Sequence, residues 1–185
     1  MPIIALPPAY AWIDQEGAPK LLMEMRKLYG VKETPGKGDN PVIIEWAKEI
    51  GVSKIYTHDE TAWCGLAMGI AAHRAGKEIV KDPLWALNWA NFGVPAPVPM
   101  LGDILTFKRF DGTGKLIGGH VTLYVGEDKA GYFHCLGGNQ SDMVSFARIH
   151  KNRLHAARRT NFNVQPANVR QVILTATGTI TTNEA

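Results

Sequence analysis

The chain has 185 residues, of which 45% are hydrophobic and 20% are charged, and these values exclude wholesale disorder and the fibrous classes. A formal net charge of +3 is too small, and the basic residues are too scattered, to indicate a protein that binds nucleic acid. Because no apolar run approaches the ~18 residues of a membrane span, we expect a soluble protein without membrane insertion.

The chain length fits one domain and requires no second one. We expect residues 1–160 to form this domain and residues 161–185 to form a C-terminal extension, with one added strand and a loose tail from Ala176. The N-terminus has no basic start, and Pro7 and Pro8 interrupt it before an apolar region can form. It therefore does not match a standard secretory signal peptide.

The first half of the chain has the periodicity and the end signals of helices. Apolar residues recur at helical spacing before Gly30, and Asn40 followed by Pro41 is typical of a helix start. The mostly apolar run 61–75 begins with Thr61, an N-cap residue type, and Gly76 follows its end. The predicted helices are 18–29, 41–50, 61–75 and 83–92.

The pattern changes at 94–99, where three prolines at alternate positions indicate an extended segment. After it, β-branched and aromatic residues alternate with a period of two, separated by turn signals at 111–114 and 127–131. Helices first and strands afterwards predict an α+β fold, with helices packed on one face of an antiparallel sheet. The predicted strands are 104–107, 119–125, 131–136, 143–146, 154–158 and 169–175.

Cys64 lies in the first turn of the predicted helix 61–75. A thiol there faces the positive end of the helix dipole and unpaired backbone N–H groups, which favour its thiolate form. Trp63 can exclude water, and Gly65 leaves room for a substrate carbonyl. Simple packing is the alternative, because cysteine is among the most buried residue types. A second cysteine, Cys135, gives no disulfide framework, so we expect a reducing compartment and free thiols.

A cysteine nucleophile needs a base, and His120 is the best candidate among the six histidines. It follows Gly118 and Gly119, which leave room for a substrate backbone, and it precedes an apolar strand that can hold the imidazole rigidly. A polar side chain on a solvated sheet face is the alternative interpretation. His58 and His134 are the weaker candidates for the base.

A catalytic histidine also needs a hydrogen-bond acceptor on its second nitrogen. We predict Asn139 for this role, because its short amide directly follows two glycines. Gln140, with the same group on a longer arm, is the second choice, and His134 is the third. A turn residue that tolerates positive φ is the alternative for Asn139. Cysteine on a helix, histidine on a strand and an amide after the next strand follow the Cys-His-Asn order of papain-like enzymes.

Five segments share both their motifs and their order with one known family. They are GVKETPGKGDNP at 30–41, DETAWC at 59–64, GDI at 102–104, GHV at 119–121 and LGGNQS at 136–141. On these motifs the chain resembles the NlpC/P60 and CHAP superfamily of peptidoglycan hydrolases, in its compact phage and prophage branch. It departs from that branch at Ala62, where a proline is usual, and in continuing past Arg159.

The resemblance implies a papain-like α+β fold, with residues 1–160 as the catalytic domain. It also implies a cysteine-dependent hydrolase, an N-acetylmuramoyl-L-alanine amidase or a peptidoglycan endopeptidase, that cleaves an amide bond of the bacterial cell wall. The catalytic residues are then Cys64, His120 and Asn139. The substrate-binding residues are then Trp63, Gly65, Gly119 and Gln140. We expect no metal and no other cofactor, since no His, Cys, Asp or Glu cluster has zinc-binding spacing.

The same resemblance gives bacterial peptidoglycan as the partner. We expect a monomer, a phage or prophage endolysin, that stays in the cytoplasm until a holin or a specialised system releases it. It then acts on the wall. The basic segment 148–159 is expected to help hold an anionic wall. Two other functions stay open: a phage tail or baseplate component that binds the wall without catalysis, and an intracellular cysteine peptidase or acyltransferase.

Overall fold

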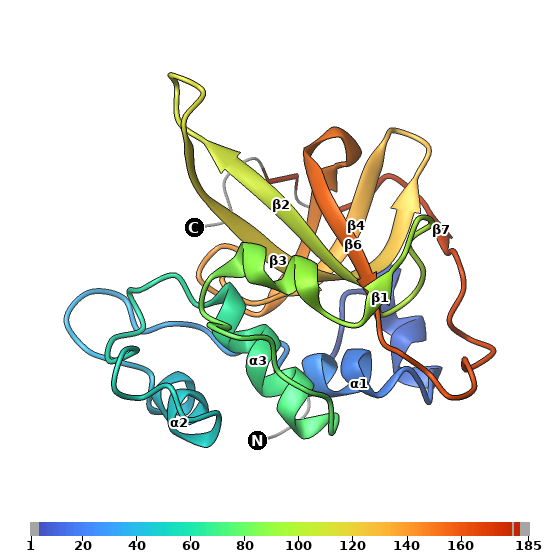
Figure 1. The fold of residues 1–185 in the computed structure, drawn as a ribbon. Coiled ribbons are helices and arrows are strands. Elements are labelled where there is room, and N and C mark those ends of the chain that lie inside the picture. The colour runs from blue at the N-terminus through green and yellow to red at the C-terminus, as the bar shows by residue number, and fades with distance from the viewer. Residues whose placement is uncertain (1–3, 179, 182–185) are drawn as a thin grey trace.

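The computed structural model describes residues 4–178, 180 and 181. In it, helices from the first half of the chain form one layer and strands from the second half form a sheet above them (Figure 1). The predicted α+β class, with helices first and strands afterwards, is confirmed. None of the helices in these residues combines the length and the apolar character needed to cross a membrane.

The sheet consists of β1 (Val94–Pro95), β2 (Ile104–Phe110), β3 (Leu116–Asp128), β4 (Tyr132–Gly137), β5 (Ser145–His150), β6 (Leu154–Arg159) and β7 (Ile173–Leu174). Their order is β1-β6-β2-β3-β4-β5, and all of these neighbours are antiparallel. The short β7 adds to β3 in parallel. The long β3 is therefore central, with β2 and β4 on its two sides.

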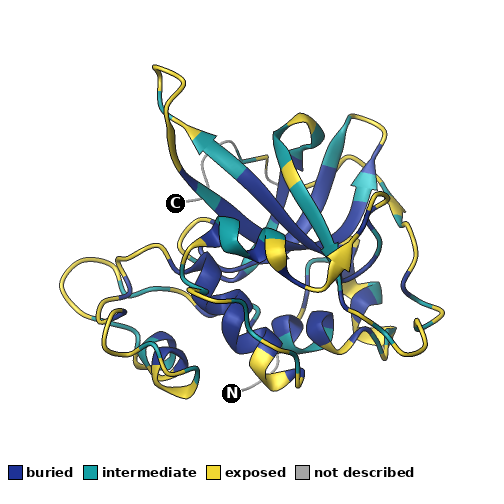
Figure 2. Cartoon of the chain, viewed as in Figure 1, coloured by how far each residue is buried: buried dark blue, intermediate teal, exposed yellow. Residues whose placement is uncertain are grey.

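The helical layer consists of η1 (Pro8–Gln15), α1 (Lys20–Lys27), α2 (Pro41–Glu49), α3 (Cys64–Arg74) and η2 (Ala86–Asn91), and a further short turn, η3 (Lys151–Arg153), precedes β6. The centre of this layer is α3, which packs against α1, α2 and β3. Its residues 64–72 are all buried. Figure 2 shows this burial continuing from α3 into the middle of the sheet. The start of α3 is thereby held in the core.

Apolar side chains form two clusters on the sheet. Ile104 and Leu123, which pair across β2 and β3, belong to the cluster that includes the helices. Their neighbours Leu105 and Tyr124 belong to a smaller second cluster. This division follows from the alternation of side chains between the two faces of a strand.

The predicted helix 83–92 is wrong, because only the short 3₁₀ helix η2 forms there. Trp85 has an extended backbone, with φ −82° and ψ 106°. The side chains of Asn88 and Trp89 donate back to carbonyl oxygens of residues 81–83. These bonds close a turn where the sequence pattern predicts a regular helix.

Other boundaries also differ from the sequence prediction, among them three near the site and in the sheet. The central helix begins at Cys64, and its N-cap is Trp63 rather than Thr61. The strand predicted at 143–146 is shifted, since β5 begins at Ser145. The strand predicted at 169–175 is only the two residues of β7.

The C-terminal extension lies against the rest of the chain. The Glu127 N–H donates to the Val172 carbonyl at 2.8 Å, and the Thr181 N–H donates to the Arg148 carbonyl at 3.1 Å. The described part of the expected loose tail after Ala176 is thus bonded to β5. The remaining residues of that tail, 179 and 182–185, lie outside the described residues.

Candidate active site

Cys64 is the first residue of α3, with Trp63 at the N-cap position. The first bond within the helix runs from the Ala67 N–H to the Trp63 carbonyl at 2.9 Å, so the N–H groups of residues 64–66 have no acceptor within the helix. These groups surround the sulfur with positive partial charge. Cys64 is 4% exposed, so little water competes for them.

Packing holds the start of α3 on two sides. Trp63 is fully buried, and its Nε1 donates to Glu33 Oε2 at 3.0 Å. On the other side, a Cβ added to Gly65 would lie 2.7 Å from the Leu84 carbonyl oxygen. Backbone therefore lies directly against the helix beside Cys64, and the position of the thiol is set by groups that move little.

His120, on β3, is the histidine that interacts with Cys64. Burial is the largest influence on the thiol and by itself raises the pKa. The hydrogen bond to His120, the charge of this imidazole, and the N–H groups of Val121 and Gly65 all favour the thiolate. Together they bring the pKa of Cys64 below its ordinary value, as suits a nucleophile.

Gln140 contacts the far side of the His120 ring. Its Oε1 lies 3.1 Å from His120 Nε2, which leaves Nδ1 as the nitrogen for the thiol. The Gln140 amide nitrogen donates to the Ser145 carbonyl, and the Ser145 hydroxyl donates to the Gln140 carbonyl at 2.7 Å. Because the amide NH₂ is engaged with Ser145, its oxygen is directed at the imidazole.

The structure therefore places Gln140, the second choice, where the sequence analysis expected Asn139. Asn139 has φ 54°, the left-handed conformation of a turn residue, which agrees with the alternative interpretation. A Cβ on the preceding Gly138 would lie 2.9 Å from the Trp63 ring, so the backbone here lies close to α3. With the chain turned at Asn139, the next side chain is the one that reaches His120. The expected role of Gln140 in substrate binding stays a prediction.

Trp63, Gly65 and Gly119, which the sequence analysis expected to line a substrate site, are all closely packed against other parts of the fold. Trp63 is fully buried. The open side of Gly65 is occupied by the backbone at Leu84, and that of Gly119 by Leu87, whose Cγ would lie 2.7 Å from an added Cβ. Trp63 and Gly65 are buried in this conformation, whereas Gly119 is partly exposed, and the expected contacts of these residues with a substrate stay predictions.

The two weaker histidine candidates belong to other networks. His134 is buried; its Nδ1 lies 2.7 Å from the Tyr10 hydroxyl and its Nε2 lies 3.1 Å from Asp128 Oδ2. Burial lowers the pKa of His134 even though Asp128 acts in the opposite direction. His58 is exposed, and its Nδ1 lies 3.3 Å from Asp39. Both imidazoles thus have partners other than Cys64.

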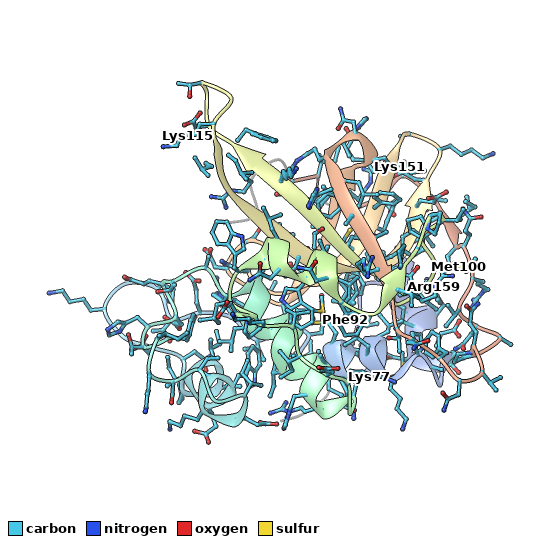
Figure 3. All side chains as sticks on the ribbon, in the orientation of Figure 1. Lys77, Phe92, Met100, Lys115, Lys151 and Arg159 are labelled. Atoms are coloured by element: carbon cyan, nitrogen blue, oxygen red, sulfur yellow. The ribbon has the colours of Figure 1, made fainter. Side chains whose placement is uncertain are left out.

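Most arginines of the basic segment 148–159 are engaged in the fold. Arg148 is nearly buried and donates twice to Asp128, at 2.9 and 2.6 Å. Arg158 donates to the carbonyl oxygens of residues 92 and 93. Arg159, labelled in Figure 3, pairs with Asp103 at 2.7 Å. Three of the cations expected to hold an anionic wall are therefore engaged in contacts within the fold.

Two supports of the site are not predicted from the sequence. Ser145, at the start of β5, exchanges hydrogen bonds with Gln140. Leu87, in η2, packs against Gly119 next to the base. No local signal marks either residue. The two glycines before His120 do indicate that other atoms approach the backbone closely, and the side chain of Leu87 is the group that does so.

Over the described residues, no three His, Cys, Asp or Glu side chains are arranged to hold a metal ion. Within the described residues, neither Cys64 nor Cys135 is part of a disulfide. No family model matches the chain, and comparisons with curated proteins and with solved structures found no match. Function is therefore inferred from the geometry around Cys64.

Proposed function

We propose that the chain is a cysteine-dependent hydrolase that cleaves an amide bond of the bacterial cell wall. The observation that supports this most strongly is the buried series Cys64, His120 and Gln140. In it a helix-start thiol interacts with an imidazole whose other nitrogen lies 3.1 Å from a carboxamide oxygen. Such a series generates a thiolate and holds its base in one orientation.

The reaction proceeds through a thioester. His120 accepts the thiol proton, the sulfur attacks the amide carbon, and a C–S bond forms while the carbonyl becomes an oxyanion. The oxyanion collapses, the C–N bond breaks, and His120 gives its proton to the leaving nitrogen, which departs as an amine. Water then gives a proton to His120 and attacks the thioester. The C–S bond breaks, the carboxylic acid leaves, and His120 returns its proton to the sulfur, which restores Cys64.

The start of α3 supplies donors for the oxyanion. The N–H groups of residues 64–66 have no acceptor within the helix, and the N–H of Gly65 already donates to the sulfur. The N–H of Cys64 is then the donor best placed for the carbonyl oxygen of a bound substrate. Removing one such donor costs about 3 kcal/mol of barrier in enzymes of this kind, so the packing that holds this turn serves catalysis directly.

Gln140 acts as a positioning residue. It touches neither the thiol nor the expected carbonyl position, and its carboxamide holds the tautomer of His120 in which Nε2 carries the proton. In this tautomer Nδ1 is free of its proton and can accept the one from Cys64. The series is then Cys-His-Gln, in place of the Cys-His-Asn order expected from the sequence.

The cell wall as substrate, and a papain-like version of the α+β fold, are inferred from the resemblance of segments 30–41, 59–64, 102–104, 119–121 and 136–141 to the NlpC/P60 and CHAP superfamily. The site residues of the proposal fall within three of these segments. A central helix that carries the cysteine, and strands that position the histidine and the amide, are compatible with that fold.

Digestion of purified peptidoglycan tests the proposal. Incubation with the native chain should release fragments with new amino groups and new carboxyl ends, identified by mass spectrometry, and Cys64→Ala should release none. A wall-binding component without catalysis would sediment with the peptidoglycan and leave it intact. An intracellular peptidase or acyltransferase would act on soluble peptides or acyl donors and leave the wall unchanged. Either of the last two results would contradict the proposal.

A further inference from the structure

A closed turn carries a half-exposed indole next to the candidate site. The Trp85 N–H donates to the Asp82 carbonyl at 3.1 Å, and the Asn88 N–H donates to the Trp85 carbonyl at 3.0 Å. The Asn88 side chain also donates to the Asp82 carbonyl, at 3.0 Å. Trp85 is therefore held by backbone bonds on both sides, yet 49% of it is exposed. An exposed indole held in one position offers a ligand an apolar face together with a polar N–H edge.

The two ends of this turn lie against the neighbours of both reacting residues. The Leu84 carbonyl lies against Gly65, the residue after Cys64, and Leu87 lies against Gly119, the residue before His120. Figure 1 shows η2 crossing β3 close to the start of α3. Trp85, between Leu84 and Leu87, is thus carried on the segment that borders the thiol and the imidazole.

A cavity of about 610 Å³ borders the same turn. Its size is within the range of small-molecule sites. Asp82 and Asn88, the residues bonded to Trp85, both belong to its lining. Lys77 and Phe92, labelled in Figure 3, mark two further parts of it. The cavity and the indole therefore flank one turn.

The lining of the cavity contains several polar side chains and carries no net charge. It contains two lysines and two acidic residues, Lys77, Glu78, Lys81 and Asp82. Among the described residues, neither the side chains of Asn91 and Asn161 nor the peptide groups of 78–80 have hydrogen-bond partners. Amide donors and acceptors with no net charge suit a neutral ligand with many hydroxyl or amide groups.

We propose that the segment 76–93 binds the glycan part of the substrate. A sugar ring stacks its C–H face on Trp85 beside the scissile amide, and a further sugar places its hydroxyl and acetamido groups in the cavity lined by Asn91 and Asn161. A sugar ring has the required combination of an apolar face and a hydrogen-bonding edge. This inference rests on the proposed function and narrows its substrate to glycan-linked peptide.

Binding of a pure saccharide tests the inference without requiring turnover. The full chain carrying Cys64→Ser is titrated by calorimetry with a β-1,4-linked tetramer of N-acetylglucosamine, and in parallel with the tripeptide Ala-Glu-Lys. We expect the saccharide to bind, and we expect any affinity for the tripeptide, which the site at Cys64 can take up, to be the same in Trp85→Ala as in the parent. Trp85→Ala should weaken saccharide binding about tenfold, and Trp85→Phe should restore most of it. Ile55→Ala, at a side chain 71% exposed in the loop between α2 and α3 and outside the cavity lining, is the control that should bind the saccharide as the parent does.

A second variant probes the cavity separately from the indole. Asn91→Ala combined with Asn161→Ala should weaken saccharide binding while the melting temperature stays the same, because both side chains are exposed. Failure of Cys64→Ser to bind the saccharide, or unchanged saccharide affinity in Trp85→Ala, would overturn the inference.

Wall digestion by the native chain separates this inference from the proposed function. Digestion of the wall without saccharide binding would support the proposed hydrolase and refute the proposed glycan site. Saccharide binding without digestion of the wall would support the proposed glycan site and refute the proposed hydrolase.

Discussion

Replacing Gln140 by alanine removes the acceptor for His120 while leaving Cys64 untouched. Two buried hydrogen bonds disappear, one to His120 Nε2 and one to the Ser145 carbonyl. Each leaves a buried polar group without its partner, at about 1–3 kcal/mol. A total of about 3 kcal/mol lowers the melting temperature of a chain of this size by about 6–12 °C. Because the imidazole also loses its fixed tautomer, kcat should fall about 10²-fold.

Two matched variants isolate this effect. Asn139→Gly removes the neighbouring amide at a position with φ 54°, which glycine adopts without strain, so it should keep nearly native turnover. Gln140→Glu keeps an acceptor for His120 but cannot donate to Ser145, so it should retain more activity than Gln140→Ala. Turnover of peptidoglycan and the rate of alkylation of Cys64 by iodoacetamide are both measured well below the lowest melting temperature.

Equal turnover and equal alkylation rates in folded Gln140→Ala and Asn139→Gly would refute the assignment of Gln140. Loss of activity in Asn139→Gly, with native activity in Gln140→Ala, would return the positioning role to Asn139. The alkylation rate of Cys64 is also measured as a function of pH in each variant. In the variant that loses the orientation of His120, the pKa of the Cys64 thiol should rise.

Three further predictions follow from the packing and the buried charges. Gly65→Ala should lower stability by about 1–3 kcal/mol in thermal unfolding, because its methyl group would meet backbone carbonyl oxygens that cannot easily move; an unchanged melting temperature would show that this contact is loose. Burial lowers the pKa of His134 between Tyr10 and Asp128, so its contribution to stability is complete above the ordinary imidazole pKa and decreases as the pH falls below it. Identical urea midpoints at pH 7 and pH 5 would contradict this. Cys135→Ala should leave the alkylation rate of Cys64 unchanged, since Cys135 lies in the separate cluster of the sheet.

The elements that carry the reacting atoms could be predicted from the sequence. The apolar run after Cys64 ended by Gly76 indicated a buried helix, and the alternating residues after His120 indicated a strand. Both patterns depend on local periodicity, which burial in one core preserves. The helix begins three residues later than expected, because Trp63 rather than Thr61 occupies the N-cap position.

The choice between Asn139 and Gln140 could not be made from the sequence. It depends on how the backbone turns after β4, where Gly138 meets the Trp63 ring and Asn139 adopts a positive φ. The contact of Gln140 with Ser145 joins two sides of that turn. Such tertiary contacts decide which side chain points inward, and the periodicity of the sequence does not predict them.

The region of η2 differs from its prediction for a similar reason. Pro83 and the apolar residues after it have the pattern of a helix, but Asn88 and Trp89 bond back to carbonyl groups at 81–83. Side-chain bonds of this kind compete with helix formation. The resulting turn holds Trp85 at the surface, and a regular helix would have placed it differently.

Trapping the acyl-enzyme tests most directly whether Cys64 is the nucleophile of an amide hydrolase. The native chain is mixed with soluble peptidoglycan fragments, quenched in acid within one turnover, digested and analysed by mass spectrometry. A wall fragment should be found attached through a thioester to the peptide that contains Cys64, and the adduct should be absent in Cys64→Ala, which should also release no products. Cleavage of the wall by Cys64→Ala, or an adduct located on Cys135, would contradict the account.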